Sequence, residues 1–310
     1  MNVIQVKELV KRYGEVVALD HFDLEVKAGE ILGLLGPNGC GKTTAIHCML
    51  NLLTFQGGDI RLFGDVNTRT AWKKQVGIVP QELAYFENLT VQENIDFFCG
   101  LYVEDKTLRK QYVEDAIRFV RLEEYRKFFP KKLSGGLKRR LNIACGIAHQ
   151  PQLIFMDEPT VAVDAQSRQF ILEGIKALNA AGKTIVYTTH YLDEADYLCD
   201  RIVIMDKGRH VVSGTPTELR NQVSTQEVIQ LELLDEPSEM LKTQFAQLAH
   251  LQQVHYDKQV CTLSFSQVGY HLATIAMLLQ EHQQTYLALN SKKPSLNEVF
   301  LAFTGKELRD

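Results

Sequence analysis

A glycine-rich loop near the N-terminus carries the strongest signal for chemistry. It matches the pattern GxxxxGK followed by Ser or Thr, and Thr44 comes directly after it: Gly36-Pro37-Asn38-Gly39-Cys40-Gly41-Lys42-Thr43. An apolar run at 30–35 precedes the loop and a helical pattern at 42–53 follows it, the context that such a loop requires. Backbone N–H groups and a helix N-terminus both favour phosphate oxygens. The loop therefore predicts a phosphate site in which Lys42 reaches the β- and γ-phosphates and Thr43 binds Mg²⁺.

Two adjacent carboxylates end a second apolar run. The run 153–156 is followed directly by Asp157 and Glu158. Such an ending is common in strands and would say little alone. Combined with the phosphate loop, it predicts a phosphoryl-transfer site in which Asp157 binds Mg²⁺ and Glu158 polarises an attacking water.

The elements that must position these residues indicate an α/β domain. Short, nearly continuous apolar runs are typical of strands covered on both faces, and they occur at 30–35, 76–79, 153–156, 184–187 and 201–205. Helical patterns separate them, including one at 166–181 that Gly182 can end. Between Gln81 and Gln150 the strand signal disappears, and Thr90 with Glu93 forms a capping box that opens a helix. The pattern predicts an all-helical insert at about 82–150.

Composition changes near residue 220, where we place a domain boundary. Residues 1–220 hold 18 of the 20 glycines, whereas residues 221–310 carry all of the net charge of -4. A glycine-poor tail is poorly suited to binding phosphate. Strand patterns at 228–233 and 260–265, helical patterns at 239–249 and 269–281, and a capping box at Ser295 and Glu298 before a last helix predict a small α+β domain.

Composition excludes several classes of protein. Hydrophobic residues make up 45% and charged residues 23%, which excludes a disordered chain. No apolar run approaches the roughly 18 residues of a membrane-spanning helix, and the first residues do not resemble a secretion signal. The small net charge does not predict nucleic-acid binding.

Side-chain chemistry gives two further expectations. The six cysteines form no CxxC pair, so we expect reduced, buried thiols. Cys40 is the expected exception, because a helix N-terminus and nearby positive charge should lower its pKa. In the run Lys138-Arg139-Arg140, we expect solvated surface charge for at least two of the three residues; contact with a nucleotide or a partner is the alternative.

Taken together, these residues resemble ATP-binding cassette (ABC) ATPases over roughly residues 1–220. Further short elements match that family in the expected order: Tyr13 where an aromatic stacks on adenine, Gln81 at the Q-loop, Leu133-Ser134-Gly135-Gly136 at the signature, Val161-Ala162-Val163-Asp164 at the D-loop and His190 at the switch position. Leu137 departs from the family, because the signature usually has glutamine there.

The resemblance implies a P-loop NTPase cassette with an antiparallel β-subdomain and a helical insert, followed by the small α+β domain. It implies ATP and Mg²⁺ as cofactors, with Glu158 and His190 catalytic and Thr43, Gln81 and Asp157 at the metal. Two cassettes would pack head to tail, so that Ser134, Gly135 and Gly136 meet the γ-phosphate bound by the opposite subunit. The remaining nucleotide contacts would come from the phosphate loop, Thr44, Tyr13 and Asp164.

The leading hypothesis for the work done is the ATPase subunit of a transporter, with export as the expected direction. Segments 159–168 and 295–301 resemble bacterial exporter ATPases. The implied partners are a separate integral membrane permease and a second copy of the cassette, or a paralogous one, at the cytoplasmic face of the membrane. Nucleic acid is not an expected partner.

Two alternatives remain. One is a non-transport cassette ATPase that acts on DNA or ribosomes; the absence of a long coiled-coil insertion and of a second cassette argues against it. The other is a non-catalytic regulatory cassette, against which Glu158 and His190 count.

Overall fold

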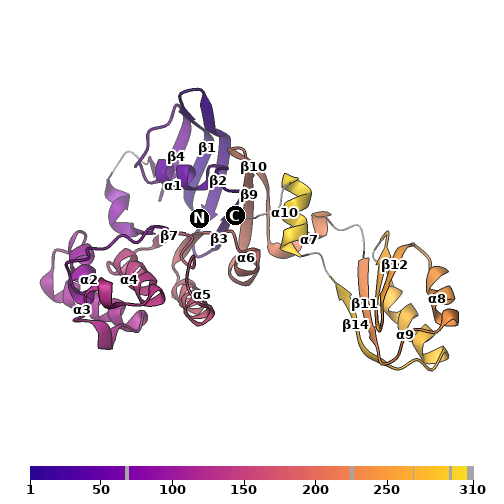
Figure 1. Ribbon diagram of the computed structural model, residues 1–310. Helices are drawn as coiled ribbons and strands as arrows, with labels where there is room; N and C mark the ends of the chain where they lie inside the picture. The colour runs from indigo at the N-terminus through magenta and orange to yellow at the C-terminus, as the bar shows by residue number, and fades with distance from the viewer. Residues whose placement is uncertain (67–69, 224–226, 268, 293–294, 306–310) are drawn as a thin grey trace. The chain divides into compact units, whose positions relative to one another are not determined.

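The computed structural model describes residues 1–310 except 67–69, 224–226, 268, 293–294 and 306–310 (Figure 1). The chain forms two compact units. The first comprises residues 1–216 together with the described residues from Phe303 onward, and the second comprises residues 217–302. The boundary expected near residue 220 lies inside helix α7 (Pro216–Val223).

The first unit is built around a six-stranded sheet that contains all five predicted strands. Its order is β10 (Arg209–Gly214), β9 (Arg201–Asp206), β3 (Ile31–Leu35), β8 (Thr184–Thr188), β7 (Leu153–Asp157) and β6 (Val76–Val79). The strands from β9 to β6 are parallel, and β10 pairs antiparallel to β9. Every residue of β3 and β8 is buried, which explains why these segments are continuous apolar runs.

A second, antiparallel sheet has the order β2 (Val16–Lys27), β1 (Asn2–Tyr13), β4 (Gly57–Leu62) and β5 (Asp65–Val66). Helix α1 (Lys42–Met49) follows the phosphate loop and shares one apolar core with both sheets. This helix is shorter than the predicted 42–53, and Asn51 adopts a positive φ of 55° just beyond its end. The core that forms around α1 therefore fixes the helix whose first residues are Lys42 and Thr43.

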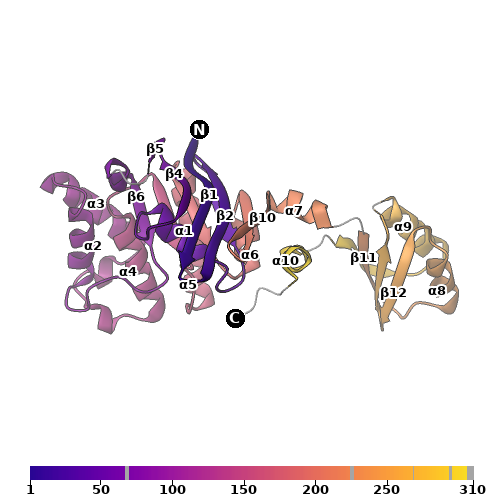
Figure 2. The same cartoon turned by 90° about the horizontal axis from the view of Figure 1, so that it is seen from above.

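The segment between Gln81 and Gln150, all of it described, contains helices and no strand, as predicted. Its helices are α2 (Val91–Gly100), α3 (Lys106–Phe119) and α4 (Gly135–Ile147), with short 3₁₀ turns η2 (Glu123–Tyr125) and η3 (Pro130–Lys132). Both halves of the capping box of Thr90 and Glu93 are formed. Figure 2 shows the three helices gathered side by side, and each packs against the other two.

Two more helices follow the strands that carry the predicted site. Helix α5 (Ala165–Ala180) comes after β7, and α6 (Leu192–Leu198) comes after β8. Asp164 caps α5 by accepting a hydrogen bond from the backbone N–H of Ser167 at 2.8 Å. Gly182 follows the end of α5 with a φ of 86°, as expected for a glycine beyond a helix C-terminus. The 3₁₀ turn η1 (Ala71–Gln75) leads into β6.

The second unit has a four-stranded antiparallel sheet in the order β12 (Leu251–Asp257), β13 (Val260–Phe265), β11 (Glu227–Leu233) and β14 (Tyr286–Lys292). Helices α8 (Glu239–Ala246) and α9 (His271–Glu281) contribute Leu241, Phe245 and Ile275 to its core. Helix α10 (Leu296–Thr304) begins at the predicted capping box of Ser295 and Glu298. Among the described residues, no helix has the length and apolar character needed to cross a bilayer.

Candidate functional site

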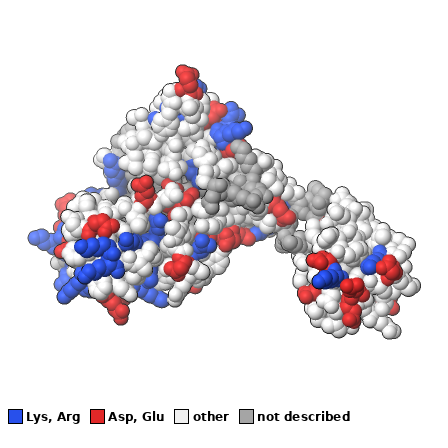
Figure 3. Space-filling model, in the orientation of Figure 1, with Lys and Arg blue, Asp and Glu red and all other residues white. Residues whose placement is uncertain are grey.

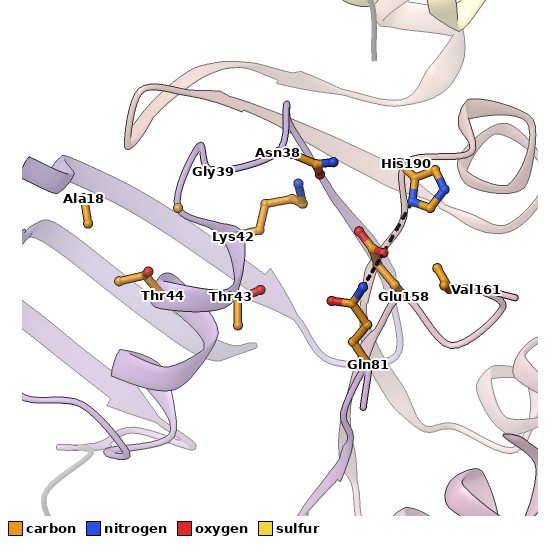
Figure 4. Close-up of a pocket in the computed structure, with 11 residues that line it drawn as sticks. Ala18, Asn38, Gly39, Lys42, Thr43, Thr44, Gln81, Glu158, Val161 and His190 are labelled. Carbon is orange, nitrogen blue, oxygen red and sulfur yellow. Dashed lines mark hydrogen bonds and ion pairs between the residues drawn. The ribbon is translucent and has the colours of Figure 1, made fainter. Parts of the chain in front are cut away.

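Four segments that follow strands of the central sheet enclose a cavity of about 470 Å³ in the first unit (Figure 4). Parallel strands place their carboxyl ends at one edge of a sheet, where ligands of open α/β folds bind. The cavity is lined by Ala18, Asn38, Gly39, Gly41, Lys42, Thr43, Thr44, Gln81, Glu158, Val161 and His190. The structure therefore brings the phosphate loop together with the Q-loop, Glu158 and the switch histidine.

The phosphate loop has a backbone that needs glycine. Gly41 has a φ of 110°, and a Cβ added there would lie 2.7 Å from the carbonyl oxygen of Ala18. A Cβ at Gly36 would lie 2.5 Å from the carbonyl oxygen of Met205. The ammonium group of Lys42 donates to the carbonyl of Gly36 at 2.7 Å. The ammonium thus lies within the loop, where its charge favours a phosphate group.

Oxygen ligands suited to a hard divalent cation meet where β7 ends and α1 begins. The hydroxyl of Thr43 donates to Asp157 Oδ2 at 3.2 Å. The hydroxyl of Thr188 donates to the other carboxylate oxygen, Oδ1. Carboxylate and hydroxyl oxygens are ligands that Mg²⁺ accepts beside phosphate oxygens, so Thr43 and Asp157 fit the metal site that the sequence predicts.

Glu158 lies at the centre of the polar contacts in the cavity. Its side chain is largely buried, and its backbone has a φ of 46°, an uncommon value for a residue with a side chain. Its backbone N–H donates to the carbonyl of Thr188 at 3.1 Å. Gln81 Nε2 donates to Glu158 Oε2 at 3.2 Å, and His190 Nδ1 lies 3.3 Å from the same oxygen. Figure 4 shows Gln81 and His190 approaching this carboxylate from two sides.

The signature residues lie outside this cavity. Ser134 caps α4, and its Oγ accepts from the backbone N–H of Leu137 at 3.4 Å. A Cβ at Gly136 would lie 2.2 Å from Ser167 Oγ and 3.3 Å from Asp164 Oδ2. Within one chain, the signature therefore packs against the beginning of α5 and not against the phosphate loop.

Tyr13 also lies outside the cavity lining. Its side chain is 48% exposed, and the Lys11 ammonium lies 4.8 Å from the centre of its ring. An exposed ring remains free to stack on a planar base. The structure thus leaves the adenine contact of Tyr13 as a prediction.

The expectation for Cys40 is wrong. The side chain is only 4% exposed and belongs to the apolar core shared by the two sheets. Burial raises the pKa of the Cys40 thiol, and this outweighs the lowering effects of the Lys42 charge and of a backbone hydrogen bond from Lys42. The Cys40 backbone lies beside a helix N-terminus, but its side chain packs into the apolar core.

In the basic run, Arg139 is not surface charge, an outcome that the expectation for at least two of the three residues allows. Its side chain is 6% exposed, and burial lowers its pKa. Arg139 Nη1 donates to the carbonyl of Gln81 at 2.7 Å, and Nη2 donates to the carbonyl of Val161 at 3.4 Å. The guanidinium therefore joins the signature helix to the Q-loop and the D-loop. Helical spacing puts Arg139 on the same face as Gly136 and Ile143, a signal that could have indicated burial.

Fold and site together define a class: a P-loop nucleotide-binding ATPase whose central sheet carries a helical insert and a separate antiparallel sheet. Comparison with known proteins narrows this class. A family model described as "ABC transporter" matches residues 19–161. The linearmycin resistance ATP-binding protein LnrL of Bacillus subtilis is 37% identical over 313 residues, which cover 99% of this chain and 100% of the relative.

Two further proteins extend the comparison. The Nod factor export ATP-binding protein I of Ralstonia nicotianae is 35% identical over 99% of this chain and 95% of its own length. A solved dimeric ATP-binding cassette, in a post-hydrolysis state with ADP and Pi, superposes with a TM-score of 0.63 and 26% identity, covering 68% of this chain and 98% of the other.

The chain belongs to the ABC transporter family and is an ATP-binding subunit of that family. The predicted cassette fold, ATP binding and ATPase class are thereby confirmed. The alternative of an ATPase acting on nucleic acid or ribosomes gains no support from these relatives.

Proposed function

We propose that the chain hydrolyses Mg-ATP in the cavity at its phosphate loop and thereby drives export through a separate membrane permease. One observation carries the proposal: Gln81 and His190 both contact Glu158 in the cavity that Lys42 and Thr43 also line. In this proposal Glu158 is the general base, beside the groups that would hold the γ-phosphate.

Thr43 and Asp157 would hold Mg²⁺, with Gln81 as a further ligand. When bound, the metal neutralises charge on the β- and γ-phosphates. Thr188 orients Asp157 by donating to it, so the carboxylate has a fixed direction before any ligand arrives. Lys42 lines the same cavity and would bind the phosphates from the loop side.

Glu158 would act on the attacking water. Its Oε2 accepts from Gln81, so the carboxylate is oriented by a neighbour that also lines the cavity. An oriented carboxylate can hold a water and accept its proton as the bond to phosphorus forms. His190 would contact the γ-phosphate and hold the water in line. Glu158 and His190 follow the carboxyl ends of the adjacent strands β7 and β8, respectively.

A second cassette would complete the site. Ser134, Gly135 and Gly136 lie at the N-terminus of α4, which is a natural site for an anion. Because they lie outside the cavity of their own chain, they are available to a nucleotide held by another cassette. The dimeric cassette with ADP and Pi supports this arrangement. The partner would be a second copy of this chain or a paralogue, with Asp164 beside the shared nucleotide.

The permease, the direction of transport and the location at the cytoplasmic face of the membrane belong to the same proposal. Both full-length relatives are named for resistance or export. Figure 3 shows Lys and Arg side chains gathered over the helical insert of the first unit. The exposed lysines of the insert include Lys106, Lys110, Lys127, Lys131 and Lys132. Positive charge is favoured near the anionic cytoplasmic leaflet.

The test is the substitution Glu158→Gln, which keeps the shape of the side chain but removes its basicity. We expect ATP binding to persist and steady-state turnover to fall by about a hundredfold or more. Phosphate release and binding of a fluorescent ATP analogue are measured on the same preparation. Turnover equal to that of the unsubstituted protein would remove Glu158 from this role.

A further inference from the structure

The first unit also buries a carboxylate close to the segments that carry Glu158 and His190, and the mechanism above gives this carboxylate no role. Glu194, on α6, is 1% exposed. Its Oε2 accepts hydrogen bonds from three hydroxyl groups: Thr160 at 3.0 Å, Tyr187 at 2.7 Å and Thr189 at 2.8 Å. All three donors are themselves buried. One oxygen atom therefore joins three separate points of the backbone.

Two of these points lie beside the catalytic candidates. Thr160 is the second residue after Glu158, and Thr189 immediately precedes His190. Tyr187 anchors the same oxygen to strand β8. Because both loops are tied to one atom, the Glu194 carboxylate limits how far Glu158 and His190 can move apart. Their side chains are separated by 3.3 Å between Glu158 Oε2 and His190 Nδ1.

A second set of contacts reaches the His190 ring itself. Arg168 Nε lies 3.4 Å from Glu194 Oε1, and the guanidinium carbon lies 4.2 Å from the centre of the Tyr191 ring. The Tyr191 ring in turn contacts the His190 ring, with their centres 4.0 Å apart. Arg168 belongs to α5, which begins directly after the D-loop. The contacts therefore run from α5 to the switch histidine.

The hydroxyl of Thr189 links the two sets. It donates to Glu194 and also accepts from the backbone N–H of Tyr191 at 3.0 Å. These two bonds hold the backbone on both sides of His190. Hydrogen bonds to an ionised acceptor are stronger than those between neutral groups. Burial and the nearby Glu194 carboxylate raise the pKa of Tyr187 well above its ordinary value, so the phenol stays a donor.

We propose that Glu194 is a positioning residue for ATP hydrolysis. Its hydrogen bonds with Thr160, Tyr187 and Thr189 form a clamp that joins the segments following β7 and β8 and keeps His190 next to Glu158. Arg168 and Tyr191 extend this control to α5. The inference rests on the proposed catalytic roles of Glu158 and His190. Neither Glu194 nor its hydroxyl donors line the nucleotide cavity, so loss of the clamp should lower kcat and leave the affinity for ATP unchanged.

The sharpest test compares two variants that each lose one buried threonine hydroxyl. One hydroxyl belongs to the clamp and the other does not. Thr189→Val and Thr184→Val both replace a buried threonine near β8 with a residue of similar shape. The Thr184 hydroxyl accepts from the backbone N–H of Gly29 and does not contact Glu194. We expect Thr189→Val to lower kcat by about ten- to a hundredfold, with KM and the thermal midpoint close to those of Thr184→Val. Equal kcat in the two variants would overturn the proposal.

Glu194→Gln and Arg168→Lys complete the series. The amide keeps one acceptor but loses the charge, and lysine keeps the charge but loses the planar contact with Tyr191. We expect both to lower kcat while ATP affinity persists. Should either variant fold poorly, the threonine pair decides the outcome. Glu158→Gln is assayed in parallel: if it abolishes turnover while the clamp variants keep unsubstituted kcat, the clamp is wrong and the proposed function stands. Unsubstituted turnover in Glu158→Gln would contradict the proposed function itself.

Discussion

The two units of the chain differ in what they bury. The first unit buries charged side chains around the ends of its parallel strands, among them Lys42, Arg139, Glu158 and Glu194. The described part of the second unit buries only Glu227 and His271 among its titratable side chains other than Cys and Tyr, and its core is otherwise apolar.

Burying a charge is costly unless hydrogen bonds or ion pairs compensate it. The first unit supplies such partners for these four side chains: backbone carbonyls for Lys42 and Arg139, the Gln81 amide for Glu158, and hydroxyls for Glu194. Clusters of this kind concentrate at functional sites. The buried charged groups that surround the candidate site therefore belong to the first unit.

The largest effect on nucleotide binding is expected from Gly41→Ala. A Cβ there meets the Ala18 carbonyl at 2.7 Å with φ at 110°, so the loop must shift and its N–H groups leave the phosphates. Strain of about 1–3 kcal/mol predicts roughly tenfold weaker ATP binding or more. Gly57→Ala is the control, because Gly57 lies outside the cavity lining, has no left-handed φ, and a Cβ there would meet the Val10 side chain at an ordinary 3.6 Å. Equal affinities in a titration of the two variants would contradict this reading of the loop.

A smaller effect is expected from Arg139→Met. The substitution leaves the carbonyls of Gln81 and Val161 without their buried donor, at a cost of about 1–3 kcal/mol. We expect turnover to fall about tenfold, together with a lower thermal midpoint. Lys138→Met serves as the control on the same helix because Lys138 is not buried. Indistinguishable turnover in the two variants would mean that the bridge by Arg139 is not needed for hydrolysis.

Removing residues 221–310, which hold most of the second unit and the last residues of the first, should change nucleotide binding little. A chain that ends at Arg220 keeps every residue that lines the cavity, and its α/β part is large enough for a core of its own. We expect a folded product that binds Mg-ATP within about threefold of the full chain, a difference of less than 1 kcal/mol. An unfolded product in circular dichroism would show that the tail completes the core of the first unit.

The smallest effect is expected at Cys40. Burial holds its thiol neutral at pH 7 and raises its pKa. Maleimide labelling should therefore be slow near neutrality and should increase as the pH approaches that raised pKa. Cys40→Ala should bind ATP with little change, because the loop contacts phosphate through its backbone. Peptide mapping by mass spectrometry measures the labelling, and fast labelling of Cys40 at pH 7 would contradict the buried thiol.

Local patterns were sufficient to predict much of the fold. The five parallel strands of the six-stranded central sheet were found because both of their faces are buried, which leaves continuous apolar runs. Strands β1 and β2 were not delimited from the sequence. Their buried residues alternate with exposed ones, and shifts of register interrupt the pairing between the two strands.

The residues of the candidate site also differ in whether the sequence alone could predict them. The phosphate loop, Asp157 and Glu158 lie in short motifs that need only neighbouring residues to be recognised. Arg139 and Glu194 were not predicted, because their partners lie far along the chain and only the folded structure shows their burial. Cys40 was misjudged for the same reason, since the direction of its side chain is set by the core.

The most direct measurement is size-exclusion chromatography of Glu158→Gln with Mg-ATP and with Mg-ADP. If Glu158 activates the water and the signature of one cassette completes the site of another, ATP should persist and hold two chains together. We expect Glu158→Gln to form a dimer with Mg-ATP and to stay a monomer with Mg-ADP, whereas the unsubstituted chain should not accumulate the dimer. A monomer of Glu158→Gln under saturating Mg-ATP, or unsubstituted turnover in that variant, would contradict the account.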